Sequence, residues 1–168
     1  MKNSFSLDNI DAFFFDFDGV MTNNLVYLNS KGEEFVGCNR SDGMAFDALR
    51  KLRKPCYILS TEHNPVVSSR AKKLEIIAIQ GVDNKVNALE SIAETKGFDL
   101  KHILYVGNDL NDFHAMTICG YSVCPSDSHN KIKEISDIVL NSLGGEGVIR
   151  ELVEDVLGID LINILYTT

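Results

Sequence analysis

The sequence lacks any apolar run that approaches the ~20 residues of a membrane span, and its N-terminus has no signal-peptide pattern. Its four cysteines form no C-x-x-C pair, and its four histidines lack the spacing of a zinc site. Basic residues are too few to balance the acidic ones, and the formal net charge is −8. We therefore expect a cytoplasmic protein with free thiols, and neither nucleic acid nor an anionic membrane as its partner.

Length and composition are those of one globular unit. The chain has 168 residues, of which 45% are hydrophobic, enough for a substantial core. No low-complexity tract, linker or internal repeat divides it. The sequence predicts a single domain over residues 1–168.

Short apolar segments alternate along the chain with longer amphipathic ones. Strands are expected near 13–15, 56–59, 76–79, 103–106, 121–124 and 138–140, and helices near 41–52, 64–74, 84–96, 111–119 and 148–157. Residues 29–32 (Asn-Ser-Lys-Gly) between two further short strands predict a β-hairpin. This alternation predicts an α/β fold with a doubly wound, mostly parallel sheet, whose site lies at the carboxyl ends of the strands.

The first strand ends in two carboxylates, Asp16 and Asp18, followed by Gly19. Asp16 can point up from the sheet as a nucleophile, and Gly19 lets the backbone turn without a Cβ clash. Two acids at a strand end also favour a divalent cation. An ordinary turn after a strand would explain this motif equally well by itself.

Two further strand or helix ends carry candidate groups for a phosphoryl ligand. Ser60 leaves an apolar strand, and its hydroxyl can donate to a phosphoryl oxygen or, alternatively, cap the next helix. Lys85 lies at the start of a helix, where a cation is disfavoured unless an anion lies nearby; an exposed surface lysine is the alternative.

A fourth strand end is crowded with acids and amides, Gly-Asn-Asp-Leu-Asn-Asp over residues 107–112. Hard oxygen ligands opposite Asp16 suit Mg²⁺. A helix N-cap made by Asp109 or Asn111 explains any one of these residues, but not four together.

In order and spacing, these four segments resemble the motifs of the haloacid dehalogenase (HAD) phosphatase superfamily, which implies a Rossmann-like sheet. The resemblance implies that Asp16 attacks phosphorus and that Asp18 protonates the leaving alcohol and then activates water. It implies that Ser60 and Lys85 hold the phosphoryl oxygens. The implied Mg²⁺ ligands are Asp16, the backbone carbonyl of Asp18, and either Asn108 or Asp109.

The segments between the motifs are too short to form a cap domain. A capless chain of this kind resembles the 3-deoxy-D-manno-octulosonate (KDO) 8-phosphate phosphatases and their relatives that act on nine-carbon sugar acids. That resemblance implies a homotetramer, in which the hairpin and the glycine segment 144–147 of one subunit approach another subunit's active site. Without this resemblance, the glycine segment would be interpreted as a flexible loop before a helix, with no role in the active site.

The same resemblance suggests which residues bind a phosphorylated sugar acid. The expected residues are Ser41, Asp42, Thr61, Glu62, Arg70, Lys73, Asn111 and Arg150. Arg70 and Lys73 share a helix face and could bind the sugar carboxylate, although a solvated charged face is the alternative. Glu62 stands where KDO 8-phosphate phosphatases tend to carry arginine, and it favours a nonulosonate 9-phosphate, with KDO 8-phosphate as the second candidate.

The resemblance has departures. Asn108 stands where aspartate is usual, as in phosphatase-like domains associated with sialic acid activation, some of which have lost activity. Ser60-Thr61 replaces the usual Thr-Gly but keeps a hydroxyl. Leu143 stands before the paired glycines where arginine is common. A competing hypothesis is therefore a catalytically weak HAD module whose role is oligomerisation.

Overall fold

Six parallel strands form the centre of the molecule in a computed structural model, which describes residues 5–167. Their order across the sheet is β5 (Ile77–Ile79), β4 (Cys56–Leu59), β1 (Ala12–Phe15), β6 (Ile103–Val106), β7 (Tyr121–Cys124) and β8 (Ile138–Val139). Every pairing within this sheet is parallel. The predicted doubly wound parallel sheet is confirmed, and β1, which carries Asp16 at its end, lies between β4 and β6.

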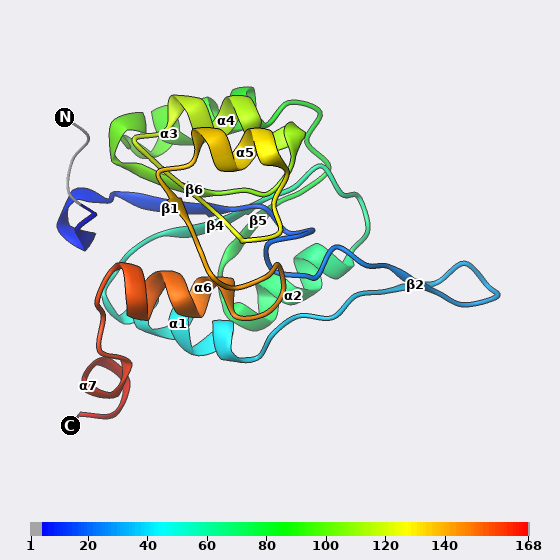
Figure 1. The fold of residues 1–168 in the computed structure, drawn as a ribbon, viewed down its shortest axis with the longest axis horizontal. Coiled ribbons are helices and arrows are strands. Elements are labelled where there is room, and N and C mark those ends of the chain that lie inside the picture. The colour runs from blue at the N-terminus through cyan, green and yellow to red at the C-terminus, as the bar shows by residue number, and fades with distance from the viewer. Residues whose placement is uncertain (1–4, 168) are drawn as a thin grey trace.

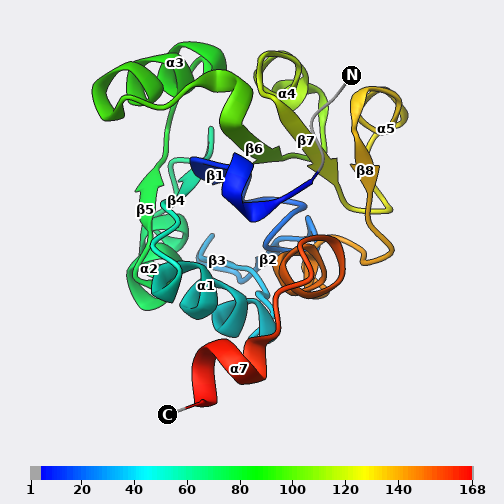
Figure 2. The same ribbon diagram turned by 90° about the vertical axis from the view of Figure 1, so that its left-hand side faces the viewer.

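Helices cover both faces of the sheet (Figures 1 and 2). One face carries α3 (Lys85–Lys96), α4 (Phe113–Ile118) and α5 (Asn130–Ile135), and the other carries α1 (Ser41–Lys51), α2 (Val66–Leu74) and α6 (Val148–Glu151). Short 3₁₀ turns occur at Leu7–Asn9, Leu100–His102 and Leu110–Asp112. Across residues 5–167, no helix has the length and apolar character needed to cross a membrane.

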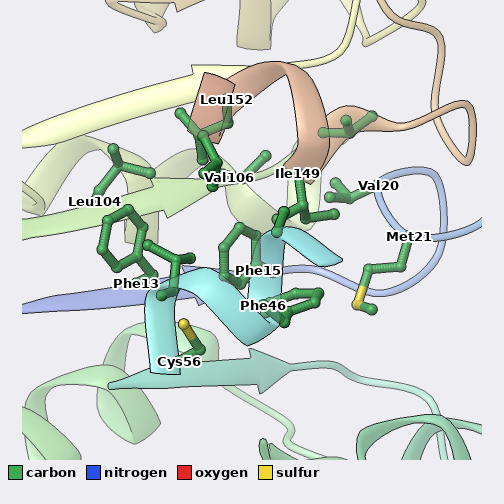
Figure 3. Packing of buried hydrophobic residues seen from close by; sticks show 14 of the residues in the cluster. Phe13, Phe15, Val20, Met21, Phe46, Cys56, Leu104, Val106, Ile149 and Leu152 are labelled. Atoms are coloured by element: carbon green, nitrogen blue, oxygen red, sulfur yellow. The ribbon is translucent and has the colours of Figure 1, made fainter. Parts of the chain in front are cut away.

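The aromatic run of β1 builds the core on both faces. Side chains alternate along a strand, so Phe13 and Phe15 point to the α1 side while Phe14 points to the α3 side. All three are fully buried. Figure 3 shows Phe13 and Phe15 packed with Phe46 of α1 and Ile149 of α6. Burial of each large apolar side chain contributes about 1.5–3 kcal/mol, so this packing fixes the strand end that carries Asp16.

The predicted hairpin is present as β2 (Tyr27–Leu28) and β3 (Glu34–Phe35), which pair antiparallel. It projects from the domain on the side where β1 ends, as Figure 1 shows. Between Ser60 and Lys85 the chain forms only α2 and β5. Neither the hairpin nor the stretch that holds α2 and β5 forms a separate cap domain over the active site. The predicted capless architecture is confirmed.

Two of the helices, α5 and α7 (Leu161–Tyr166), were not expected from the sequence. Helix α5 is six residues long and buries only Ile132, so it gives too short a periodic signal. Helix α7 follows a π-helical segment, Leu152–Val156, and packs against α1. Its N-cap Asp160, whose side chain accepts a hydrogen bond from the Asn163 N–H, was a usable signal.

Candidate active site

The loops that follow β1, β4 and β6 surround one cavity of about 310 Å³. Its lining residues are Asp16, Asp18, Asn24, Ser60, Thr61, Asn108, Asp109, Leu110 and Asn111. Parallel strands deliver their carboxyl ends to the same sheet edge, which is why residues so distant in sequence meet here. The structure thus brings together most of the residues predicted for catalysis and metal binding.

Lys85 connects two buried carboxylates. Its Nζ lies 2.7 Å from Asp16 Oδ1 and 2.7 Å from Asp112 Oδ1, and all three side chains are buried. Asp112 Oδ1 also accepts a hydrogen bond of 2.9 Å from the Tyr105 hydroxyl. Breaking a buried ion pair of this kind leaves an uncompensated charge, so Lys85 is held in place beside Asp16. The alternative of an exposed surface lysine is ruled out.

Burial raises the pKa of Asp16 to about 7, with a further contribution from the negative charge of Asp112. Lys85 opposes this shift but does not cancel it. The pKa of Asp18 is also raised, first by burial and then by the nearby Glu62 carboxylate. Burial and charge repulsion therefore favour the protonated form of both acids, and a further cation beside Lys85 would oppose this effect.

Gly19 permits the close approach of two site loops. It has a φ of 84°, and a Cβ at this position would lie 2.7 Å from the Asn108 side-chain carbon Cγ. A side chain here would displace Asn108 as well as strain the backbone. Gly19 therefore keeps Asn108 next to the Asp16–Asp18 turn.

The Asn108 amide tests whether the site suits Mg²⁺. One polar atom of that amide lies 2.9 Å from the Asp18 carbonyl oxygen and 3.3 Å from Asp16 Oδ2. With nitrogen on this side, the amide donates to both oxygens; with oxygen there, three oxygens face one another and favour a cation between them. Neighbouring ligands of an octahedral Mg²⁺ lie about 2.9 Å apart, because each Mg–O bond is ~2.0–2.1 Å. The oxygen donors fit Mg²⁺.

Asp109 is placed differently from Asn108. Its carboxylate accepts a 2.7 Å hydrogen bond from the Leu110 N–H and caps the 3₁₀ turn, while its own N–H donates to Asp112 Oδ2 at 3.3 Å. Within the described chain, no three acidic, histidine or cysteine side chains gather into a metal cluster. The geometry therefore favours an amide and a backbone carbonyl beside Asp16 as the metal donors.

Ser60 and Thr61 line the cavity on the side of β4, and Glu62 follows them in the same loop. Ser60 is buried, and its Oγ accepts a 3.1 Å hydrogen bond from the Glu62 N–H. Glu62 Oε1 accepts hydrogen bonds of 2.7 Å from the His63 and Asn64 N–H groups. The Asn64 side chain donates to Glu34 of the hairpin at 3.1 Å. These bonds fix the loop and leave the Ser60 hydroxyl hydrogen available to a ligand.

Other predicted substrate residues lie outside this cavity. Ser41 and Arg150 line a separate hollow of 370 Å³, and Arg70 and Lys73 line another of 290 Å³. Asp42 is buried, and its Oδ1 accepts hydrogen bonds from the Ile149 and Arg150 N–H groups, which anchors α6 to α1.

Several of these side chains have structural partners. Arg150 pairs with Glu154, and Arg70 donates a 2.9 Å hydrogen bond to the Asn39 carbonyl. Thr61 and Asn111, by contrast, line the cavity, and Glu62 lies close enough to raise the pKa of Asp18.

The sequence analysis gave no specific role to several residues of the site. Asp112 belongs to the predicted acidic run, and four hydrogen-bond donors converge on its carboxylate, including the Asn108 N–H at 2.9 Å. Its position at the end of that run was a usable signal. Tyr105 was hidden within an apolar strand pattern, and Asn24 follows no motif that the sequence reveals.

Comparison with known proteins gives the same assignment as the geometry. Residues 40–152 match the family model of haloacid dehalogenase-like hydrolases. The 3-deoxy-D-manno-octulosonate 8-phosphate phosphatase KdsC of Salmonella typhi is 30% identical over 146 residues, which cover 86% of this chain and 78% of that protein.

Two solved structures show how far the similarity extends. A HAD family hydrolase from Streptomyces avermitilis superposes with a TM-score of 0.91 at 39% identity, covering 96% of this chain and 92% of that one. The Moraxella catarrhalis KDO 8-phosphate phosphatase, solved with magnesium, phosphate and KDO, gives a TM-score of 0.85 at 30% identity, covering 89% and 87%. The chain therefore belongs to the haloacid dehalogenase-like hydrolases, as a magnesium-dependent phosphoric monoester hydrolase of the KDO 8-phosphate phosphatase family.

Proposed function

We propose that this protein hydrolyses the phosphate monoester of a 2-keto-3-deoxy sugar acid through a covalent phosphate on Asp16. The observation that carries the proposal is the convergence of Asp16, Asp18 and Ser60 on one cavity, with Lys85 paired to Asp16. A purely structural module would have no need of a buried lysine between two buried acids, because such a pair costs desolvation without adding reliable stability.

The residues can divide the chemistry between them. The ionised Asp16 carboxylate attacks phosphorus, the bond from phosphorus to the sugar oxygen breaks, and Asp18 donates its proton to the departing alkoxide. Asp18 then takes a proton from water, whose oxygen attacks phosphorus and releases phosphate, restoring Asp16. Ser60 Oγ and Lys85 Nζ bind phosphoryl oxygens during both steps. Bound Mg²⁺ supplies positive charge that offsets repulsion between carboxylate and phosphate.

Two substrates within the sugar-acid class have support. The names of the relatives at 30% identity favour KDO 8-phosphate. Glu62 favours a nonulosonate 9-phosphate, because its carboxylate lies near enough to Asp18 to raise the pKa of that residue and can accept hydrogen bonds from the hydroxyls of a longer sugar chain. Lys73 and Arg70 remain proposed carboxylate-binding residues, reached from a neighbouring subunit and not through the cavity of their own chain.

We also propose a homotetramer as the working form. The hairpin exposes Tyr27, Leu28 and Phe35, each more than half accessible, and apolar side chains grouped on a projecting hairpin favour burial against another copy. Such an assembly would cover an active site that has no cap. A cytoplasmic location remains a prediction.

The test is a panel of phosphorylated sugars and sugar acids assayed with Mg²⁺ and with a chelator. The panel includes KDO 8-phosphate, a nonulosonate 9-phosphate and simple hexose phosphates. We expect Mg²⁺-dependent hydrolysis of at least one sugar-acid phosphate, at a higher kcat/KM than any hexose phosphate. Glu62→Arg should shift the preference toward KDO 8-phosphate if the nonulosonate 9-phosphate is the better substrate.

Two outcomes of this panel would oppose the proposal. Inactivity on every phosphate at high Mg²⁺ would favour the catalytically weak module suggested by Asn108. A preference for hexose phosphates would contradict the proposed sugar-acid substrate, but it would still agree with the proposed phosphatase reaction.

A further inference from the structure

The loop between β8 and α6, residues 141–147, contacts the turn that follows Asp18 directly, and it reaches the Asn108 loop through residues 126–129. We call it the glycine strap, after its three glycines, Gly144, Gly145 and Gly147. Glu151 of α6 anchors its start, because its carboxylate accepts hydrogen bonds from the Asn141 and Ser142 N–H groups at 2.8 and 2.7 Å. The strap is therefore fixed at one end before it reaches the active site.

One side of the strap packs directly on the turn that follows Asp18. A Cβ on Gly144 would overlap the Gly19 carbonyl oxygen and lie 2.8 Å from its carbon. A Cβ on Gly145 would lie 2.5 Å from the Asn23 nitrogen, and the Gly145 N–H donates to the Val20 carbonyl at 3.0 Å. Backbone lies against backbone here, with no room for a side chain.

The other side of the strap contacts the loop after β7. The buried Gly144 N–H donates a 2.9 Å hydrogen bond to Asp127 Oδ1, and the Ser126 N–H donates to the Ser142 carbonyl at 3.0 Å. In the same loop, the His129 N–H donates to the Asn108 carbonyl at 2.9 Å. The strap is thus connected on one side to the turn that begins at Gly19, directly after Asp18, and on the other, through the 126–129 loop, to Asn108.

We propose that Gly144 is a positioning residue for the magnesium site of its own subunit. Its missing side chain lets the strap hold the Gly19 peptide, and with it the Asp18 carbonyl, at the distance from Asn108 that the metal needs. The inference rests on the proposed metal-dependent function. It assigns the strap a role within one chain, separate from any contact that an assembled oligomer makes.

Gly144→Ala tests this inference cleanly, because Gly144 has no left-handed φ and alanine brings steric displacement alone. The matched control is Gly120→Ala. Gly120 comes directly before β7 and so lies at the N-terminal end of the strands, opposite the end that carries the active site. Its Cβ would also overlap a backbone carbonyl, that of Lys101, and would lie 2.8 Å from the Lys101 Cα. Both variants should unfold at a lower temperature, but only one displaces the metal site.

The measurement is the Mg²⁺ dissociation constant from calorimetric titration of folded protein, with inorganic phosphate absent. We expect Gly144→Ala to bind Mg²⁺ about tenfold more weakly than wild type, the size typical of lost support around a metal site. Gly120→Ala should bind as wild type does. Excess Mg²⁺ should restore much of the turnover of Gly144→Ala, which a general loss of stability would not allow.

Wild-type affinity in Gly144→Ala, or an equal loss in Gly120→Ala, would overturn the inference. If Gly144→Ala does not fold, Asp127→Ala decides, since it removes the acceptor of the Gly144 N–H from an exposed position. Asp127→Ala should weaken Mg²⁺ binding, and unchanged affinity would count against the strap. Failure of wild type itself to bind Mg²⁺ would instead contradict the proposed function, on which the inference depends.

Discussion

Asn108 is the proposed neutral donor of the metal site, and its amide lies beside the Asp16 carboxylate. Its amide lies 3.3 Å from Asp16 Oδ2, close enough that two negative charges here would repel strongly in the absence of a cation. An amide avoids that repulsion, because its nitrogen can donate to Asp16 and to the Asp18 carbonyl when no metal is bound. In the proposed metal site, an amide would bind Mg²⁺ less tightly than a carboxylate would, but it would avoid charge repulsion when no metal is bound.

Asn108→Asp should have opposite effects on the metal-free and metal-bound protein. We expect a lower Tm without Mg²⁺, because the added carboxylate faces Asp16, and a half-saturating Mg²⁺ concentration reduced by roughly tenfold, because ligand charge raises affinity. Thermal unfolding and activity, each titrated with Mg²⁺, measure the two effects. An unchanged Mg²⁺ dependence would show that Asn108 is not a ligand.

At the scale of elements, α1 and α6 are joined through one buried carboxylate. Asp42 accepts hydrogen bonds of 3.1 and 3.0 Å from the Ile149 and Arg150 N–H groups. Burial nevertheless raises the pKa of Asp42 from 3.8 to about 6, more than these bonds lower it. The folded protein thus binds the Asp42 proton more tightly than the unfolded chain does, and ionisation of Asp42 at neutral pH opposes folding.

Asp42→Asn should therefore change the pH dependence of stability. Asparagine keeps the Oδ1 acceptor without the buried charge, so the variant should be as stable as wild type or more stable at pH 7.5. That advantage should disappear as pH falls through about 6 towards 4, where wild-type Asp42 becomes protonated. Urea unfolding at both ends of this range is the measurement.

Asp42→Ala is the control for this experiment. It loses the acceptor for α6 as well as the charge, and should be less stable than Asp42→Asn by about 1–2 kcal/mol at both pH values. A stability difference between Asp42→Asn and wild type that does not depend on pH would contradict the raised pKa.

At the scale of the whole molecule, sequence reasoning succeeded where a local pattern determines the structure. Apolar runs such as 13–15 predicted the buried strands, and parallel strand ends placed Asp16, Ser60 and Asn108 in one cavity. Sequence patterns did not predict features that depend on how the elements pack together. Helix spacing correctly put Arg70 and Lys73 on one face, but tertiary packing turns that face toward α1 and away from the catalytic cavity.

Long-range contacts explain the other unpredicted features. The hydrogen bond from Tyr105 to Asp112 and the packing of Gly144 against Gly19 depend on the final positions of loops that no periodicity encodes. Asp42 was expected to bind substrate, but its backbone partners lie in α6, far along the sequence. Such roles become visible only when the elements are assembled.

The hairpin gives the prediction that belongs to the whole molecule. Tyr27 and Phe35 are cross-strand partners and are 59% and 57% exposed. The double substitution Tyr27→Ser/Phe35→Ser should reduce a wild-type tetramer to smaller species in sedimentation velocity. It should also lower turnover of a sugar-acid phosphate more than that of a small aryl phosphate.

Ile162→Ser is the matched control for the hairpin, because Ile162 is an equally apolar and 73% exposed residue on α7. It should leave the assembly unchanged. A monomeric wild-type protein at working concentration would contradict the proposed tetramer.

The most direct test of the central claim compares Asp16→Asn with wild type in hydrolysis of the preferred sugar-acid phosphate at saturating Mg²⁺. Asparagine keeps the shape of Asp16 but cannot attack phosphorus, so turnover should fall by at least about 10⁴-fold while the Tm stays near or above that of wild type. Near-wild-type turnover in folded Asp16→Asn would contradict the account, because the phosphate would then be transferred without the residue around which this site is built.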